Sequence, residues 1–219
     1  MKRRGFAWWE LLAVIALVII AALILLPVFA RSEHTPNRRG MCQVNLKLIG
    51  LGFIQYTQDF DNHYPLVAFA ETTGGVRDAS GRGWSIPAYG WADAIQPYVK
   101  STQVYQCPSE TDAHSSTEPN QRGYIDYWYN RNLAGKNEKK ISSSSSLIII
   151  GDGADGSDDT SARYNIGSLP AAWRTDKTSP AYRHLDSANY TFADGHVKWY
   201  KPAQVSDTSK SGQPTLRAF

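Results

Sequence analysis

The sequence predicts an α+β fold, in which a long hydrophobic transmembrane helix at the N-terminus, kinked or broken near Pro27–Pro36, packs on a small antiparallel β-sheet headgroup. Three observations support this prediction. Residues Phe6–Leu26 form an almost uninterrupted apolar run. A second segment repeats apolar residues at spacings of three and four, which is typical of one face of an amphipathic helix. Near the C-terminus, two alternating runs flank Asp194-Gly195, a pattern typical of a β-hairpin.

Length and charge limit the class of protein. The chain has 219 residues, enough for one or two domains. Hydrophobic residues make up 42% and charged residues 20%, which excludes a disordered or fibrous protein for most of the chain. The net charge is +3, and Lys2, Arg3 and Arg4 account for all of it. The basic charge is therefore a topology signal at the N-terminus, and we expect no nucleic-acid partner.

The N-terminal apolar run contains one acidic residue, Glu10. As a helix, Phe6–Leu26 is about 31 Å long, enough to cross the hydrocarbon core of a bilayer. Placing an ionised carboxylate in such a membrane helix costs up to a few kcal/mol, so we expect an interaction that offsets this cost. If the chain is cut between Gly5 and Phe6, the new α-amino group of a neighbouring subunit can pair with Glu10 and fix the register between helices. The alternative is that the Glu10 carboxylate reaches the membrane interface.

The segment Arg4–Ala16 resembles the prepilin signature of type IV pilins and type II secretion pseudopilins. In that family a prepilin peptidase cuts after a glycine and methylates the new first residue, and a glutamate guides assembly. The resemblance implies cleavage after Gly5, N-methylation of Phe6 and an assembly role for Glu10. Pro27 lies where the family often has a proline that kinks the helix. The pair Trp8-Trp9 departs from the usual residues of the signature. This departure does not change the expected cleavage, methylation and assembly positions.

A second helix is expected after Pro36. Proline in a helix interior costs about 3 kcal/mol or more, whereas Thr35 as N-cap and Pro36 in the first turn would start a new helix. Downstream, Trp91–Val99 is predicted to be a short helix, and Leu147–Ile150 a buried strand. The apolar stripe of the second helix is expected to be core that packs on the sheet, and it consists of Cys42, Leu46, Ile49, Phe53, Tyr56 and Phe60.

The turn Asp194-Gly195 predicts a two-residue hairpin loop. This loop length pairs Phe192 with Val197 and Tyr190 with Trp199. Their shared apolar face is expected to lie against the helix stripe.

The rest of the chain carries a second resemblance. The segments Cys42–Gly50, Tyr56–Asp61 and Tyr105–Ser109 are similar to those of a bacterial pseudopilin-like family, whose C-terminal motif is His, nine residues, then Asp-Gly. Here that motif runs from His184 to Asp194-Gly195. The family implies an architecture more than an activity.

Together these patterns divide the chain into four parts. Residues 1–5 are expected to be a cleaved leader, and residues 6–30 a transmembrane and assembly helix. Residues 31–64 would be a linker and the amphipathic part of the pilin helix, and residues 65–219 a globular extracytoplasmic headgroup.

Two cysteines in a head outside the cytoplasm predict one disulfide, Cys42–Cys107. It would close a long loop and contribute about 4 kcal/mol on the chain-entropy model. Two buried thiols are the alternative.

The sequence offers one candidate metal site. Four aspartates, Asp152, Asp155, Asp158 and Asp159, crowd a glycine-rich loop, and carboxylates on such a loop suit Ca²⁺. No glutamate closes the loop at EF-hand spacing, and Asp/Gly runs are common in turns. A plain solvated loop is therefore favoured, and we expect no other metal or cofactor.

A catalytic interpretation has little support. The polar residues His184, Asp186, Asp194 and His196 can be drawn as a cluster, but the hairpin explains Asp194-Gly195 without chemistry. The sequence has no Cys/His pair at zinc-site spacing and no nucleophile elbow. We expect a protein that is not an enzyme.

The function implied by the resemblance is that of a bacterial structural subunit. It would sit in the inner membrane through one span, be processed by prepilin peptidase, and join copies of itself or related pilins in a type IV pilus-like extracellular filament through the assembly machinery. One alternative is a pseudopilin of a type II secretion system in a periplasmic pseudopilus. Another is a signal-anchored extracytoplasmic binding domain or enzyme.

Overall fold

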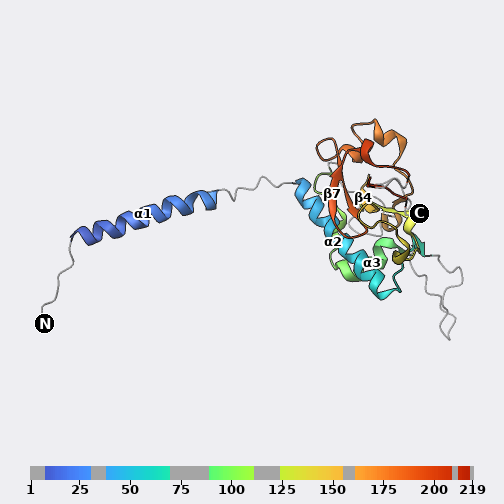
Figure 1. Cartoon of the computed structure of the whole chain (residues 1–219), viewed down its shortest axis with the longest axis horizontal. Helices are drawn as coiled ribbons and strands as arrows, with labels where there is room; N and C mark the ends of the chain where they lie inside the picture. Colours follow the sequence, from blue (N-terminus) through green and yellow to red (C-terminus); the bar gives the residue numbers. More distant parts are fainter. Residues whose placement is uncertain are drawn as a thin grey trace. The chain divides into compact units, whose positions relative to one another are not determined.

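The structure, a computed structural model, describes residues 8–30, 38–69, 89–110, 124–154, 161–208 and 212–217. The chain divides into two compact units, Met1–Asn37 and Arg38–Phe219 (Figure 1). The cleavage-site residues Gly5 and Phe6 lie outside the described residues, as does Pro36.

The first unit contains a single described helix, α1 (Trp8–Ala30). Its sequence is apolar apart from Glu10 in the first turn. Pro27 lies within the helix bounds, so the backbone remains helical past the position of the expected kink. The helix ends at Ala30, and the next helix begins at Arg38. The described helices α1 and α2 thus lie on either side of the segment in which the sequence predicts a kink or break.

The prediction that the N-terminal helix crosses a membrane is wrong. Within the described part of the chain, no helix has both the length and the apolarity needed to cross a membrane. The side chains of α1 are described from Trp8 to Leu23. The single-pass location in the inner membrane is wrong on the same finding.

The second unit is built around α2 (Arg38–Asp59). The expected stripe is buried from Cys42 to Tyr56, because residues three and four apart share one face of the helix. Phe60 departs from the expectation. It follows the end of α2, is 50% exposed, and stacks on Tyr56 with 4.2 Å between ring centroids.

The main sheet has five strands in the order β5-β3-β4-β6-β7. The strands are β3 (Tyr127–Asn130), β4 (Ile148–Asp152), β5 (Asn165–Ile166), β6 (Ala188–Phe192) and β7 (Val197–Tyr200). The prediction of an antiparallel sheet is wrong, because β3 and β5 run parallel and the sheet is mixed. A parallel pair needs a long crossover, and here the chain passes through β4 before it returns to the far side of β3.

Shorter elements complete the second unit. Strands β1 (Ala68–Phe69) and β2 (Tyr89–Gly90) pair with each other, and α3 (Trp91–Val99) follows as the sequence predicts. The 3₁₀ helices are η1 (Thr102–Tyr105), η2 (Arg131–Leu133), η3 (Glu138–Lys140), η4 (Ser161–Arg163), η5 (Ala171–Arg174), η6 (Pro180–Tyr182) and η7 (Pro202–Gln204).

The β6–β7 hairpin differs from the expected one by one residue of register. Thr191 pairs with Val197, and the backbone N–H of Phe192 donates to the carbonyl of His196 at 2.9 Å. The loop therefore has three residues and ends at Gly195, whose φ of 81° is the left-handed conformation that this loop length requires. An Asp-Gly pair fits loops of two or three residues, so the sequence alone does not set the register.

This shift reverses which face of β6 meets α2. The hydroxyl of Thr191 donates to the carbonyl of Leu46 at 3.1 Å, and Val197 packs beside the core under α2. Tyr190 and Phe192, expected against the helix, belong instead to the core on the other face of the sheet.

Two buried cores cover the two faces of the sheet. The larger joins α2 and α3 to the sheet and includes Phe53, which stacks on Trp91 and Tyr129. Close approach of α2 depends on Gly50, where an added Cβ would lie 2.6 Å from the Thr191 methyl group. The second core contains Trp128, Ile148, Tyr164, Leu169, Ala188, Tyr190, Phe192, Val205 and Leu216.

Candidate functional site

The structure presents two candidate sites, one in each unit. The first is the surface of α1, whose described large apolar side chains are exposed around the helix. Trp8 is 77% exposed, and Leu17 and Leu23 are 69% and 66% exposed. Glu10 lies in the first turn of this surface. Exposed apolar surface on this scale marks a site of association.

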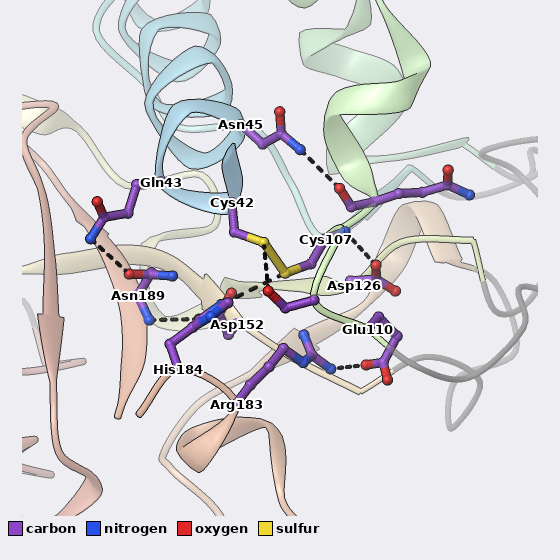
Figure 2. The surroundings of a disulfide bond; sticks show 12 residues. Cys42, Gln43, Asn45, Cys107, Glu110, Asp126, Asp152, Arg183, His184 and Asn189 are labelled. Carbon is purple, nitrogen blue, oxygen red and sulfur yellow. Dashed lines mark hydrogen bonds and ion pairs between the residues drawn. A yellow bond between two sulfur atoms is a disulfide. The ribbon is translucent and has the colours of Figure 1, made fainter. Parts of the chain in front are cut away.

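The second candidate site is the buried surroundings of a disulfide (Figure 2). Cys42 lies on the buried face of α2, and Cys107 follows η1. The two residues form the disulfide that the sequence predicts, with 5.2 Å between their Cα atoms and a separation of 65 positions in sequence. Both cysteines are almost completely buried. The bond thus ties α2 to the segment that leads into the sheet.

Asp126, just before β3, holds the loop of Cys107 in place. Its Oδ2 accepts a hydrogen bond from the backbone N–H of Cys107 at 2.5 Å. The side-chain amide of Asn45, one turn after Cys42 in α2, donates to the carbonyl of Gln106 at 2.8 Å. Both sides of the disulfide are therefore fixed by hydrogen bonds as well as by the covalent bond.

His184 lies against the disulfide on its other side. Its Nε2 is 3.6 Å from Sγ of Cys107 and 3.3 Å from Oδ2 of Asp152. The side chains of His184 and Asp152 are 1% and 0% exposed. The same Asp152 oxygen accepts a hydrogen bond from the backbone N–H of Asn189 at 2.6 Å. Sulfur, imidazole and carboxylate therefore meet in one water-excluded place.

A tight turn presents His184 to this place. The backbone N–H of His184 donates to the carbonyl of Ser187 at 2.8 Å, across the two turn residues Leu185 and Asp186. Both turn residues have positive φ, 54° and 61°. A leucine in this left-handed conformation is strained by about 1–2 kcal/mol. Leu185 is also 81% exposed, so burial of its side chain does not offset this strain.

Arg183 closes the cluster beside His184. Its guanidinium pairs with Glu110 and donates to the carbonyl of Gly153 at 2.8 Å. Burial lowers the pKa of Arg183 to about 10, so the group stays charged at neutral pH. Burial also raises the pKa of the Tyr127 phenol well above its ordinary value, with the nearby Asp152 and Asp126 charges acting in the same direction.

The aspartates proposed for calcium do not form one described site. Asp152 is at the end of β4 and points inward to His184, not into a solvated loop. Asp155, Asp158 and Asp159 lie outside the described residues.

The histidine and aspartate cluster drawn from the sequence divides into separate pairs. His196 pairs with Asp194 on the hairpin, at 2.5 Å, with the two side chains 39% and 36% exposed. His184 pairs with Asp152, a partner that sequence reasoning did not link to it. Among the described residues, the ligand atoms of Cys42, Cys107 and His184 lie within 4.8 Å of one another. No sequence spacing reveals this group, because its members lie 65 and 77 residues apart.

The aromatic residues of the central segment fill the core. Tyr124, Tyr127, Trp128 and Tyr129 are all buried.

Comparison with known proteins gives one finding. A family model described as "Protein of unknown function (DUF1559)" matches residues 37–181, more than half of the chain. The matched range contains both cysteines and Asp152 and ends three residues before His184. Comparisons with curated proteins and with solved structures gave no match.

Proposed function

Since the chain belongs to the DUF1559 family of proteins of unknown function, its function has to come from its own features, and we propose that it is a pilin-like structural subunit. After cleavage between Gly5 and Phe6, copies would assemble into a type IV pilus-like filament by packing of their N-terminal helices.

The exposed apolar surface of α1 is the main support for this proposal. Trp9, Leu12 and Val14 are 69%, 53% and 56% exposed, and they point in different directions around the helix. Leaving such side chains in water costs roughly 1.5–3 kcal/mol for each large residue that could be buried. A helix that is apolar on all sides favours burial among other helices, and a filament of identical subunits supplies them.

A second apolar stripe on α2 supports the same role. Met41, Val44, Leu48 and Leu51 are 40–59% exposed and recur at spacings of three and four, opposite the buried stripe. A helix with one stripe in its own core and another outside is suited to contacts with neighbouring subunits.

Glu10 gives the proposal a specific chemical step. It is the one acidic residue of α1, and the α-amino group created at Phe6 would provide a cation of opposite charge. Pairing between subunits would set the axial position of one helix on the next, as buried polar pairs do in other helical assemblies.

The test compares assembly of three proteins in cells that contain a prepilin peptidase and an assembly machinery. Glu10→Gln removes the charge while keeping the size of the side chain, and Glu138→Gln does the same in η3 of the head. We expect filaments from the wild type and from Glu138→Gln, and none from Glu10→Gln, in electron micrographs and in pelleting assays. Normal filaments from Glu10→Gln would refute the pairing of Glu10. Long filaments distinguish a pilus from the short pseudopilus of a secretion system.

A further inference from the structure

Three potential metal ligands converge at the disulfide, and a fourth, Asp152, lies beside His184, so that four separate segments contribute. Cys42 comes from α2, Cys107 from the segment after η1, Asp152 from the end of β4, and His184 from the turn before β6 (Figure 2). Two sulfurs, one imidazole nitrogen and one carboxylate oxygen form a donor set that zinc prefers.

Two distances from His184 match those of a tetrahedral zinc site, whereas Asp152 lies outside the group of three residues whose ligand atoms come within 4.8 Å of one another and would have to move closer to the sulfurs. With Zn–S of about 2.3 Å and Zn–N and Zn–O of about 2.0–2.2 Å, neighbouring ligand atoms lie roughly 3.6 Å apart for S and N, and roughly 3.3 Å apart for N and O. The observed distances are 3.6 Å from Cys107 Sγ to His184 Nε2 and 3.3 Å from His184 Nε2 to Asp152 Oδ2. The two sulfurs alone are too close, because they are bonded to each other.

A second observation also indicates a ligand at this place. The other oxygen of Asp152, Oδ1, is buried and has no hydrogen-bond partner among the described residues, and the same holds for Oγ of Ser187 and Nδ2 of Asn189. Buried polar groups usually have partners, so each such atom calls for an explanation. In addition, the N–H of Asn189 holds Asp152 in position, as the outer shell of a metal site does.

We infer that the dithiol form of the protein binds one zinc ion through Cys42, Cys107, His184 and Asp152. A dithiol reductant gives two electrons and two protons to the Cys42–Cys107 bond and becomes a disulfide itself, leaving two protein thiols. Zinc then binds two thiolates, and the two thiol protons pass to solvent. Either the disulfide or the zinc ion ties α2 to the loop of Cys107, so the head keeps this link in both redox states.

The test uses the full chain, reduced with a phosphine that offers no thiol to the metal, and Co²⁺ as the probe. We expect one equivalent of cobalt to bind with the visible absorption of a tetrahedral site and with thiolate-to-cobalt charge transfer. One equivalent of Zn²⁺ should remove both signals. The oxidised chain should show neither. Absence of the charge-transfer band from the reduced wild type would overturn the inference.

Two histidine variants test whether cobalt binding depends on His184 specifically. His184→Ala should weaken cobalt binding by more than about tenfold, whereas the matched control His196→Ala, on the β6–β7 hairpin, should bind like the wild type. Equal affinities of the two variants would contradict the site. If His184→Ala does not fold, X-ray absorption at the zinc edge of the reduced wild type decides. Two sulfur and two nitrogen or oxygen ligands support the site, and any other set refutes it. Filament assembly by the oxidised chain is independent of either result.

Discussion

Replacing both disulfide cysteines, as Cys42→Ala/Cys107→Ala, tests how much the head depends on this link. The bond joins residues 65 positions apart. On the chain-entropy model, closing a loop of that length lowers the entropy of the unfolded chain by an amount worth about 4 kcal/mol at 25 °C. Both side chains are almost completely buried, so the variant also loses sulfur contacts in the core. We therefore expect the free energy of unfolding to fall by about 4 kcal/mol.

Urea denaturation followed by tryptophan fluorescence measures this loss. With a slope of about 2 kcal/mol per molar urea for a unit of this size, the midpoint should fall by about 2 M. The measurement needs a chelator, so that no metal replaces the bond. Wild type reduced under the same conditions is the control and should resemble the double variant. A loss below about 1 kcal/mol would refute the role of the disulfide as the main constraint between α2 and the sheet.

Three further substitutions test the packing and electrostatics of the head. Gly151→Ala should lower the free energy of unfolding by about 1–3 kcal/mol, since its Cβ would lie 2.6 Å from Trp128 and 2.7 Å from Tyr190; an unchanged urea midpoint would show that the rings can move apart. Leu185→Gly should raise the free energy of unfolding by about 1 kcal/mol, because glycine adopts the positive φ of this turn without strain, and a lower urea midpoint would contradict the strain. Burial raises the pKa of Asp93 above its ordinary value of 3.8, outweighing the hydrogen bond from Gly90. The folded state then binds its proton more tightly than the unfolded state, so the wild type should lose stability relative to Asp93→Asn as pH rises through the raised pKa. Parallel pH profiles in urea unfolding would rule out this effect.

Local patterns in the sequence predicted the helices of the head well. The buried stripe of α2 follows from a spacing of three and four, which depends only on helix geometry. Phe60 broke the pattern because the helix ends at Asp59, and element ends are the least certain part of such a prediction. With two cysteines in the chain, the pairing of Cys42 with Cys107 had one intramolecular solution.

Features that depend on long-range packing were not predictable. The register of the hairpin rests on whether the loop takes two or three residues, and this choice decides which face of β6 meets α2. The parallel pairing of β5 depends on the path of the whole intervening chain. The cluster of His184 with Asp152 and the disulfide brings together segments that carry no shared sequence pattern.

The apolar N-terminal run was correctly predicted to be helical, but the prediction that this helix lies in a membrane was wrong. Length and composition indicated a membrane span, whereas no described helix meets the requirements for one. The exposure of the α1 side chains is the observation on which the proposed assembly rests.

The most direct test of assembly through α1 is the mass of the first peptide of the protein isolated from cells in polymeric form. We expect polymers in which the chain begins at Phe6 and its amino group carries a methyl group. A monomeric, functional protein that still begins at Met1 would contradict assembly through a processed helix.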